Sequence, residues 1–387
     1  MEYYSYYLLL TSCYFYTMQQ SFSFKQQTWK RLKKNKGALL GLFIIAIAVL
    51  LAILGYLIAP DNSPNADLQT VEIQAKKPGY TQQFLKVPDA NNIDTGNWFT
   101  TILSGERKSY RLIPISGYKI KNDSLLINKF IDEDTAVVQY FSSIQLTNDQ
   151  PQKLIAENII TKKYWLGTDK FGRDILSRLI IGTRVSLAVG LIAVLISLTL
   201  GIILGALAGY FKGWVDEVVM WLVNVTWSIP TLLLVFAITL AMGKGFWQIF
   251  IAVGLTMWVS VARLVRGQVM AVKELEFVQA AKALGFTNFR IIAKHILPNI
   301  LGPILVIAAS NFATAIIVEA GLSFLGIGVQ PPQPSWGLMI KENYNFIITH
   351  NPMLALVPGF AIMLLVLAFN LLGNGLRDAV DVKTPDV

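Results

Sequence analysis

The sequence predicts an all-α membrane protein, with about six transmembrane helices and a small α+β or β-rich extracytoplasmic insert between the first two helices. Two observations lead to this fold class. Of the 387 residues, 54% are hydrophobic and only 15% are charged, whereas a soluble domain carries about 25% charged residues. Long apolar runs also recur along the chain, and a helix needs roughly 20 apolar residues to cross the hydrocarbon layer of a bilayer.

The apolar runs define the expected spans, and the basic residues beside them define the orientation. The expected spans are Gly37–Ala59, Val185–Phe211, Val218–Met242, Phe246–Ala262, Ile300–Leu325 and Met353–Leu376. Basic residues without acidic ones lie between Lys25 and Lys36, directly before the first span, and positive charge in such a place stays in the cytoplasm. Six crossings then return the C-terminus to the cytoplasm, and the basic loop before Ile300 falls on the same side.

These spans divide the chain into parts. Residues 1–36 form a cytoplasmic N-terminal segment, 37–59 the first transmembrane helix, 60–165 the insert, 166–376 the core with the other helices, and 377–387 a cytoplasmic tail. Within the insert, residues 118–130 and 135–146 alternate apolar and polar side chains as strands do. Residues 1–17, rich in tyrosine, are either an interfacial anchor or an over-extended start before Met18, and we favour the second interpretation.

The loop between the fourth and fifth spans has the pattern of a stiff helical hinge. It reads ELEFVQAAKALGFTNFRIIAKHILPN from Glu274 to Asn299. Phe277, Ala281 and Leu284 fall on one helix face at i, i+4 and i+7, Gly285 then supplies a helix stop, and we expect a second short helix that ends at Pro298. Periodicity alone leaves open whether this apolar face docks into another protein or packs on its own bundle.

The same segment resembles the EAA loop of bacterial ABC-import permeases, whose pattern is E-A-A-x3-G-x9-I-x-L-P. The matching positions are Gln279, Ala280, Ala281, Gly285, Leu297 and Pro298. Gln279 replaces the Glu and His295 replaces the Ile of that pattern. Three further stretches, Trp165–Leu187, Gly321–Ile340 and Arg377–Asp381, resemble the dipeptide, oligopeptide and nickel permeases of binding-protein-dependent transport systems.

The resemblance implies a type I ABC-importer permease bundle in the cell inner membrane, with both termini cytoplasmic. The chain would form half of a pore for peptides, or for a related small solute such as a nickel complex. Its implied partners are a second homologous permease subunit, two cytoplasmic ABC ATPase subunits that hold ATP and Mg, and an extracytoplasmic solute-binding protein. The implied coupling residues are Phe277, Gln279, Ala280, Ala281, Leu284, Gly285, Leu297 and Pro298.

Polar residues inside the apolar runs are candidates for the translocation path. Ionisable and amide side chains in spans usually face the bundle interior, a watery cavity or another helix. Glu319, Asn311 and Asn370 are such candidates, with an interfacial position for Glu319 and helix bridging for the amides as alternatives. Asn374 belongs with them. Residues 171–186 predict either an amphipathic helix at the outer interface or a helix that leads into the membrane.

Several function classes lack support in the sequence. No phosphate loop, paired catalytic carboxylates, nucleophile elbow or HExxH motif is found, so we expect a transport subunit without its own ATPase site and not an enzyme. The single Cys13 excludes a disulfide framework, and the chain carries only two histidines, so we expect no cofactor or metal. The net charge of +9 lies beside apolar segments and does not indicate nucleic acid. A stand-alone secondary transporter or channel, and a membrane sensor with a ligand-binding insert, remain alternatives.

Overall fold

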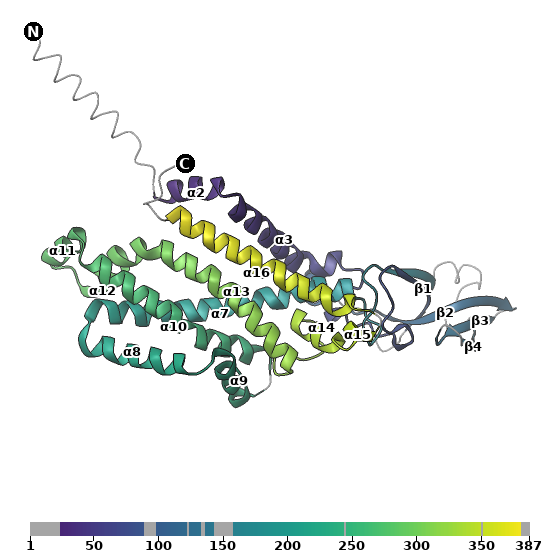
Figure 1. Cartoon of the computed structure of the whole chain (residues 1–387). Coiled ribbons are helices and arrows are strands. Elements are labelled where there is room, and N and C mark those ends of the chain that lie inside the picture. The colour runs from purple at the N-terminus through teal and green to yellow at the C-terminus, as the bar shows by residue number, and fades with distance from the viewer. Residues whose placement is uncertain are drawn as a thin grey trace, which may run out of the picture.

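The protein is a long helical bundle with a small β-sheet at one end, as seen in a computed structural model (Figure 1). The structure describes residues 24–88, 98–121, 124–132, 136–142, 158–243, 245–349 and 351–380. The predictions for residues 1–17 and for the end of the tail therefore lie outside the described residues. The sheet and the loop before α13 lie at opposite ends of the bundle.

Five helices are long and apolar enough to cross a membrane. They are α3 (Lys36–Ile58), α7 (Ile175–Phe211), α10 (Phe246–Lys273), α13 (Leu301–Leu325), whose span begins upstream at Asn288, and α16 (Met353–Val380). A sixth crossing requires α8 (Gly213–Ser228) and α9 (Thr231–Met242) together, and these two are bent by 95°. The bundle of about six spans is thus confirmed, and the expected third span, Val218–Met242, falls on the bent pair α8 and α9 and is not one continuous helix.

The bend between α8 and α9 has a local cause. Ile229 is extended, with φ −100° and ψ 129°, and Pro230 follows it. A residue before proline avoids the helical region because the proline ring crowds its backbone, and proline itself has no N–H to continue the helix. The apolar composition of this stretch is that of a span, but the proline breaks it into two arms.

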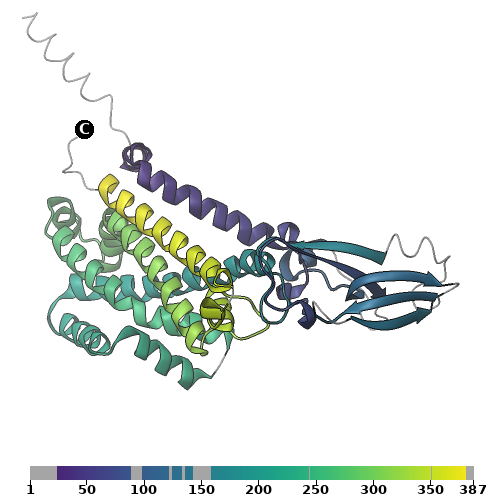
Figure 2. The ribbon, with the colours of Figure 1, turned by 45° about the vertical axis from the view of Figure 1, so that its right-hand side comes forward.

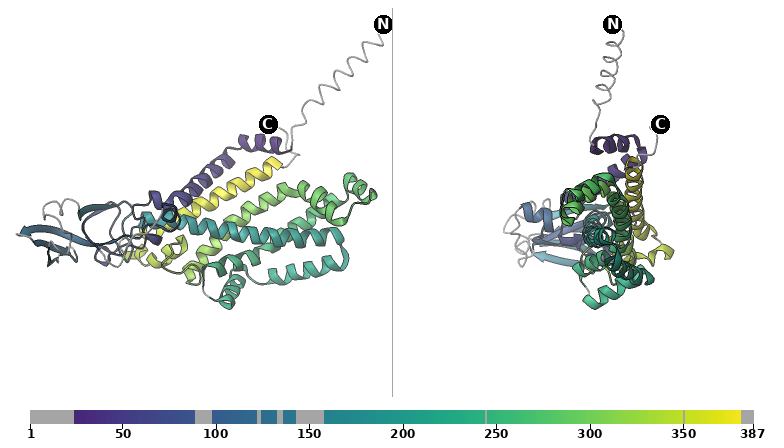
Figure 3. Two further views of the ribbon diagram at one scale, coloured as in Figure 1. Left: turned by 180° about the vertical axis from the view of Figure 1, so that it is seen from behind. Right: turned by 90° about the vertical axis from the view of Figure 1, so that its left-hand side faces the viewer.

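α7 is the centre of the bundle. Seen from behind, α3 and α16 lie on one flank, and α8 and α9 lie on the other (Figure 3). A Cβ at Gly205 would lie 2.5 Å from the carbonyl oxygen of Ala262, and one at Gly209 would lie 2.7 Å from that of Arg266. The glycine repeat of α7 therefore lets α10 approach closely, as the i+4 spacing of Gly201, Gly205 and Gly209 predicts.

The start of α7 decides between the two readings of residues 171–186. The helix begins at Ile175, is capped by the Asp174 carboxylate, which accepts from the Ser177 N–H, and runs unbroken to Phe211. This stretch is therefore the first part of a span-length helix, and a separate interfacial helix is wrong.

At the other end of the bundle, a short helix α2 (Phe24–Lys34) precedes α3 and places Leu32 beside Ala379 of α16.

The insert is an antiparallel five-stranded sheet in the order β4-β3-β2-β1-β5 (Figure 2). Its elements are β1 (Tyr80–Pro88), α4 (Trp98–Ser104), β2 (Tyr110–Lys121), β3 (Ser124–Phe130), β4 (Ala136–Ser142) and β5 (Ile159–Tyr164). β5 pairs with β1, with Tyr164 opposite Tyr80, and so returns the chain to the start of α7. The β-rich insert after the first helix is confirmed.

Two short helices close the connection between α13 and α16. They are α14 (Trp336–Asn343) and α15 (Phe346–Thr349). The Trp336 indole N–H donates to the carbonyl oxygen of Leu179 at 3.0 Å, and Gly337 lies against the backbone of Ala320. This connection is therefore packed into the sheet end of the bundle, while Pro331 and Pro332 remain exposed.

Candidate functional site

The loop between α10 and α13, residues 274–299, forms a bent elbow. Its first arm is α11 (Glu276–Ala283), which ends where Gly285 takes φ +76°. The Gly285 N–H donates to the Lys282 carbonyl at 3.0 Å, and the Phe286 N–H donates to the Ala281 carbonyl at 3.2 Å. These two bonds are those of a Schellman motif, which needs a left-handed residue after the helix. Gly285 therefore ends the first helix, as its position in the sequence predicts.

The second arm runs into the membrane helix without a stop. α12 (Asn288–Arg290) continues as a π-helical turn over Ile291–Ile296, a 3-10 turn over Leu297–Ile300, and then α13. A short helix that ends at Pro298 is thus wrong. Pro298 lacks the N–H that a regular helix needs, and the wider and tighter turns around it accommodate the missing bond. The second arm and α13 therefore form one continuous helical segment.

The elbow has a buried face and an exposed face. Val278 and Ala281 are 3% and 4% exposed and pack among Ile291, Ile296 and Ile300 of the second arm. Phe277 and Leu284 are exposed, at 42% and 73%. The predicted single stripe is therefore split, because Ala281 points into the protein while the two larger side chains point away. Ala280 also lies on the exposed face.

Three hydrogen bonds tie the elbow to the bundle. The Lys273 ammonium donates to the Tyr210 carbonyl at 2.6 Å, and the Tyr210 hydroxyl donates to Oδ1 of Asn288 at 2.8 Å. Tyr210, near the end of α7, thus holds the second arm and the end of α10, from which the first arm continues. The side-chain amide of Gln279 donates to the Lys273 carbonyl at 3.1 Å, a bond that an ionised Glu at this position is unable to form because a carboxylate only accepts.

Of the four candidates for the translocation path, Asn370 and Asn374 line an open groove, whereas Glu319 and Asn311 do not. Glu319 is fully buried and accepts from the Ser323 hydroxyl at 2.7 Å. Asn311 is 5% exposed, and its amide faces the hydroxyls of Ser197 and Ser260 at 3.5 Å. The Glu319 bond stays within α13, whereas Asn311 bridges α13 to α7 and α10. Asn370, by contrast, is exposed on α16.

Asn370 belongs to a groove that α10, α13 and α16 form together. Two adjoining cavities of about 230 Å³ and about 580 Å³ share Leu264, Val306 and Arg377. We call the combined space the polar groove. Its polar lining residues are Gln268, Ser310, Asn370, Asn374 and Arg377. Val380, at the end of α16 and at the elbow end of the groove, lies against Gly302 at the start of α13.

Comparison with known proteins gives family matches to the sequence segments before and after the β-sheet. Residues 201–384 match the family described as binding-protein-dependent transport system inner membrane component, and residues 23–75 match the N-terminal TM domain of oligopeptide transport permease C. The dipeptide transport system permease protein DppC of Alkalihalophilus pseudofirmus is 45% identical over 57% of this chain and 72% of its own length. The glutathione transport system permease protein GsiD of Pectobacterium atrosepticum is 43% identical, over 57% and 73%.

The chain belongs to the family of binding-protein-dependent transport system inner membrane components. It is a multi-pass permease of an ABC transport system and not an enzyme. Among solved structures, the MetNI methionine ABC transporter is similar at 19% identity with a TM-score of 0.45, over 53% of this chain and 97% of that one. The sheet of the permease lies between the two segments that match the families.

At the sheet end, the permease holds a buried network of charges, which we call the ionic clasp. Its members are Asp67, Asp169, Arg173, Arg178 and Glu342. Arg173 contacts Asp169 at 2.7 Å, Glu342 at 2.6 Å and Asp67 at 3.1 Å. The clasp therefore joins the chain before the sheet, the segment before α7 and the helix α14. Both arginine side chains are almost fully buried.

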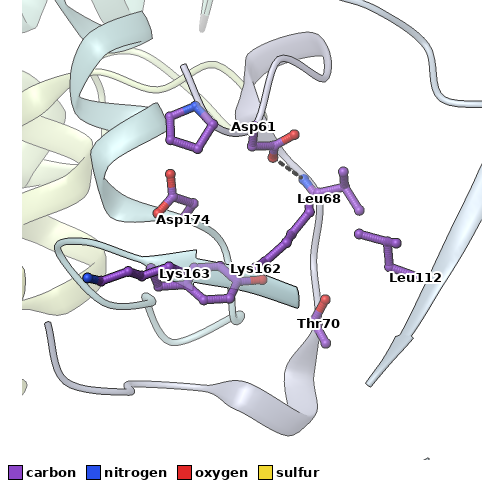
Figure 4. A pocket seen from close by; sticks show the side chains of 9 residues that line it. Asp61, Leu68, Thr70, Leu112, Lys162, Lys163 and Asp174 are labelled. Carbon is purple, nitrogen blue, oxygen red and sulfur yellow. Dashed lines mark hydrogen bonds between the residues drawn. The ribbon is translucent and has the colours of Figure 1, made fainter. Parts of the chain in front are cut away.

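Beside the clasp lies a cavity of about 90 Å³ between the sheet and α7 (Figure 4). Asp61, Asp174 and Lys162 line it. The Asp61 carboxylate accepts from the Leu68 N–H at 3.4 Å and lies 3.5 Å from the Lys108 ammonium. Burial, followed by the nearby charge of Lys108, lowers the pKa of Lys162 to about 8.

Sequence reasoning missed several residues of these sites. Phe289 is 81% exposed at the start of the second arm, and only the loop's apolar content could have drawn attention to it. Tyr210 is distant in sequence from the elbow that it holds. Gln268, Ser310 and Arg377 lie with Asn370 and Asn374 on facing helices, and the i, i+4, i+7 spacing of Asn370, Asn374 and Arg377 is a signal that the sequence does contain.

Proposed function

We propose that this permease forms half of the pore of an ATP-driven importer of short peptides and receives its cytoplasmic ATPase on the elbow. The observation that carries the proposal is the exposed apolar face of a firmly anchored elbow. Leu284 and Phe289 are 73% and 81% exposed at one end of the bundle. Large apolar side chains clustered on an exposed surface are typical of protein interfaces.

The elbow is suited to transmit movement in both directions. Its first arm follows α10 directly, its second arm continues into α13, and Tyr210 fixes the second arm and the end of α10 to α7. A displacement of the elbow by the ATPases would therefore tilt these helices and not be absorbed in a loose loop. ATP shifts the pore between inward and outward access only if it binds one of the two states more tightly. The ATP and Mg belong to the partner subunits.

The remaining parts follow from the same proposal. A second homologous permease subunit supplies the other half of the pore, and two ATPase subunits bind at the elbow end. An extracytoplasmic solute-binding protein delivers the peptide at the opposite end, where the sheet and the exposed Pro331–Pro332 loop are the candidate docking surfaces. Short peptides are proposed because two of the similar permeases are described as serving dipeptide and glutathione transport.

The coupling role is tested by polar substitution of the exposed face. We expect Leu284→Ser combined with Phe289→Ser to weaken ATPase association at least tenfold, since a truncated interface anchor costs about 2 kcal/mol or more. The thermal stability of the permease itself should change little, because exposed side chains contribute little to folding. The measurement is co-purification of the ATPase with the tagged permease from membranes.

The matched control is Val137→Ser, which removes an exposed apolar side chain from β4 at the opposite end. It should leave ATPase association unchanged. Normal co-purification of the ATPase with the double variant would refute the assignment of the elbow as its docking site.

The orientation of the elbow has its own test. In a Cys13→Ser background, a cysteine introduced as Leu284→Cys should react with a membrane-impermeant thiol reagent only in inside-out vesicles. A cysteine introduced as Ile131→Cys, near the end of β3 and 40% exposed, should react only in right-side-out cells. Labelling of both cysteines from the same side would contradict the topology in which the two termini are cytoplasmic.

A further inference from the structure

The polar groove has an unusual lining for a membrane-spanning bundle. On α16, Asn370, Gly373, Asn374 and Arg377 line it at i, i+3, i+4 and i+7. On α13, Pro303, Val306, Ile307 and Ser310 line it with the same spacing. Each helix therefore turns one continuous stripe toward the groove. α10 adds Leu264 and Gln268.

The polar side chains of the groove have no partners within the described part of the chain. None of Gln268, Asn370, Asn374 and Arg377 makes a side-chain hydrogen bond or ion pair with another described residue. Lipid tails offer no hydrogen bonds, so such side chains on a span face water, another chain or a ligand. The groove is therefore not a lipid-facing surface.

The chemical groups that line the groove indicate the kind of ligand that suits it. Its amide side chains both donate and accept hydrogen bonds, as a peptide backbone requires. Arg377 is the only charged side chain among the lining residues of the groove. The neighbouring Asp378 forms no ion pair with Arg377 among the described residues, and its carboxylate accepts from the Asn35 amide at 3.2 Å. A guanidinium binds a carboxylate through two parallel hydrogen bonds.

The length of the stripe agrees with a short ligand. From Asn370 to Arg377 the helix rises about 10 Å at 1.5 Å per residue. An extended chain covers about 3.4 Å per residue, so this length matches roughly three residues.

We propose that the polar groove is a peptide-binding segment of the translocation path, in which Arg377 binds the C-terminal carboxylate of the peptide. Gln268, Asn370 and Asn374 hydrogen-bond its backbone. Because Arg377 lies at the elbow end of the groove, the peptide would leave with its carboxylate first. This inference rests on the function proposed above and adds a residue that distinguishes peptides with a free carboxylate from those without one.

The test uses the complete transporter, with both permease subunits, the ATPases and the binding protein, in proteoliposomes. Uptake of dialanine and of dialanine amide is measured with each substrate at a concentration that saturates the binding protein. For Arg377→Gln we expect a roughly tenfold loss of dialanine uptake, the size of one hydrogen bond to a charged group. Uptake of the amide should be unchanged, and Arg377→Lys should recover part of the dialanine uptake.

Lys36→Gln is the matched control, because it removes an exposed positive charge at the same end of the bundle, outside the groove. It should leave both uptake rates unchanged. Failure of the proposed function is seen separately, as loss of ATPase co-purification or of stimulation by the binding protein in the wild type.

Several results would overturn the proposal. Equal loss of acid and amide uptake in Arg377→Gln would indicate a general structural role, and no loss would place the groove off the path. Release of the second permease subunit from this variant would assign the groove to subunit contact. An effect that disappears in vesicles of pure phosphatidylcholine would identify an anionic lipid headgroup as the ligand of Arg377.

Discussion

The two ends of the permease differ in which side chains they bury and which they expose. At the sheet end, the ionic clasp buries its charges against one another, and Arg173 reaches carboxylates from three separate segments. At the other end, the elbow buries Val278, Ala281, Ile291 and Ile296 but leaves Phe277, Leu284 and Phe289 exposed. The first junction pairs Arg173 within the chain, whereas the second leaves large apolar side chains uncovered within the described residues.

This difference suits the two ends to different roles. A buried arginine with several carboxylate partners is costly to open, because each group left behind is an unpaired charge. The clasp therefore keeps the chain before the sheet, the start of α7 and α14 in a fixed relation. The elbow gains from apolar contact, which has no strict direction, and so a partner can dock there without breaking internal bonds. The following predictions test this contrast, beginning with the largest expected effect.

Removal of the central arginine should damage the clasp most. Arg173→Met leaves Asp169 and Glu342 buried with only Arg178 nearby, and a broken buried pair costs about 3–5 kcal/mol. We expect a clearly lower melting temperature of the purified protein in detergent and faster proteolysis between the sheet and α7. Arg107→Met, at an exposed position of the insert, is the control. Equal melting temperatures for both variants would mean that the clasp does not stabilise this junction.

Adjacent alanines of the elbow should respond differently to the same substitution. Ala281→Asp places a charge among Ile291 and Ile296, and we expect a loss of about 3 kcal/mol because nothing there pairs with it. Ala280→Asp lies on the exposed face and should leave the melting temperature unchanged while it weakens ATPase association. Thermal unfolding and co-purification measure the two effects. If both variants lost stability equally, the division into buried and exposed faces would be wrong.

The sequence predicts the elements of the elbow better than its faces. Gly285 is an unambiguous helix stop, and the family pattern marks the loop. Helical spacing nevertheless groups Ala281 with Phe277 and Leu284, because it does not show which side the second arm covers. That arm covers Val278 and Ala281 with Ile291 and Ile296, and Tyr210 holds its start at Asn288. A long-range contact of this kind leaves no periodic signal.

The same limit applies to the membrane spans and their charges. Apolar length identifies five crossings and the site of a sixth, and Pro230 marks where that sixth stretch breaks, but composition does not give the 95° angle between its two arms. Alternating side chains identify β3 and β4 of the insert. The charges of Arg173 and Arg178 could be read from the sequence as the polar side of an interfacial helix, because their partners Asp67 and Glu342 come from distant segments.

The left-handed turn of the elbow should be sensitive to the residue at position 285. Gly285 has φ +76°, and no atom lies within 4 Å of where a Cβ would stand. Gly285→Ala should therefore cost about 1 kcal/mol from backbone conformation alone. Gly285→Asn should cost less, since asparagine tolerates this region. Melting temperatures of the three proteins, together with their ATPase stimulation by the binding protein, measure the effect. A lower stability for Asn than for Ala would point to a clash that the structure does not contain.

A further effect at the sheet end should be a pH dependence of stability. Burial in the cavity beside Asp61 and Asp174 lowers the pKa of Lys162 to about 8, whereas an unfolded lysine has a pKa of about 10.4. Between these values the unfolded chain binds more protons than the folded one, so stability rises with pH. Below pH 8 both states are protonated, and the cost of the buried charge is constant.

Wild-type protein should therefore gain melting temperature between pH 7.5 and pH 9.5, relative to Lys162→Met, which has no ammonium to desolvate. Lys163→Met is the control, because Lys163 is exposed on the same strand and lies 4.0 Å over the ring of Trp165. It should keep the wild-type slope. The elbow lacks a buried ammonium of this kind in its described residues, so ATPase association should not follow the same pH curve. If all three proteins had one slope, the charge of Lys162 would not be buried in the folded state, and the sheet would be joined to α7 more loosely than its contacts indicate.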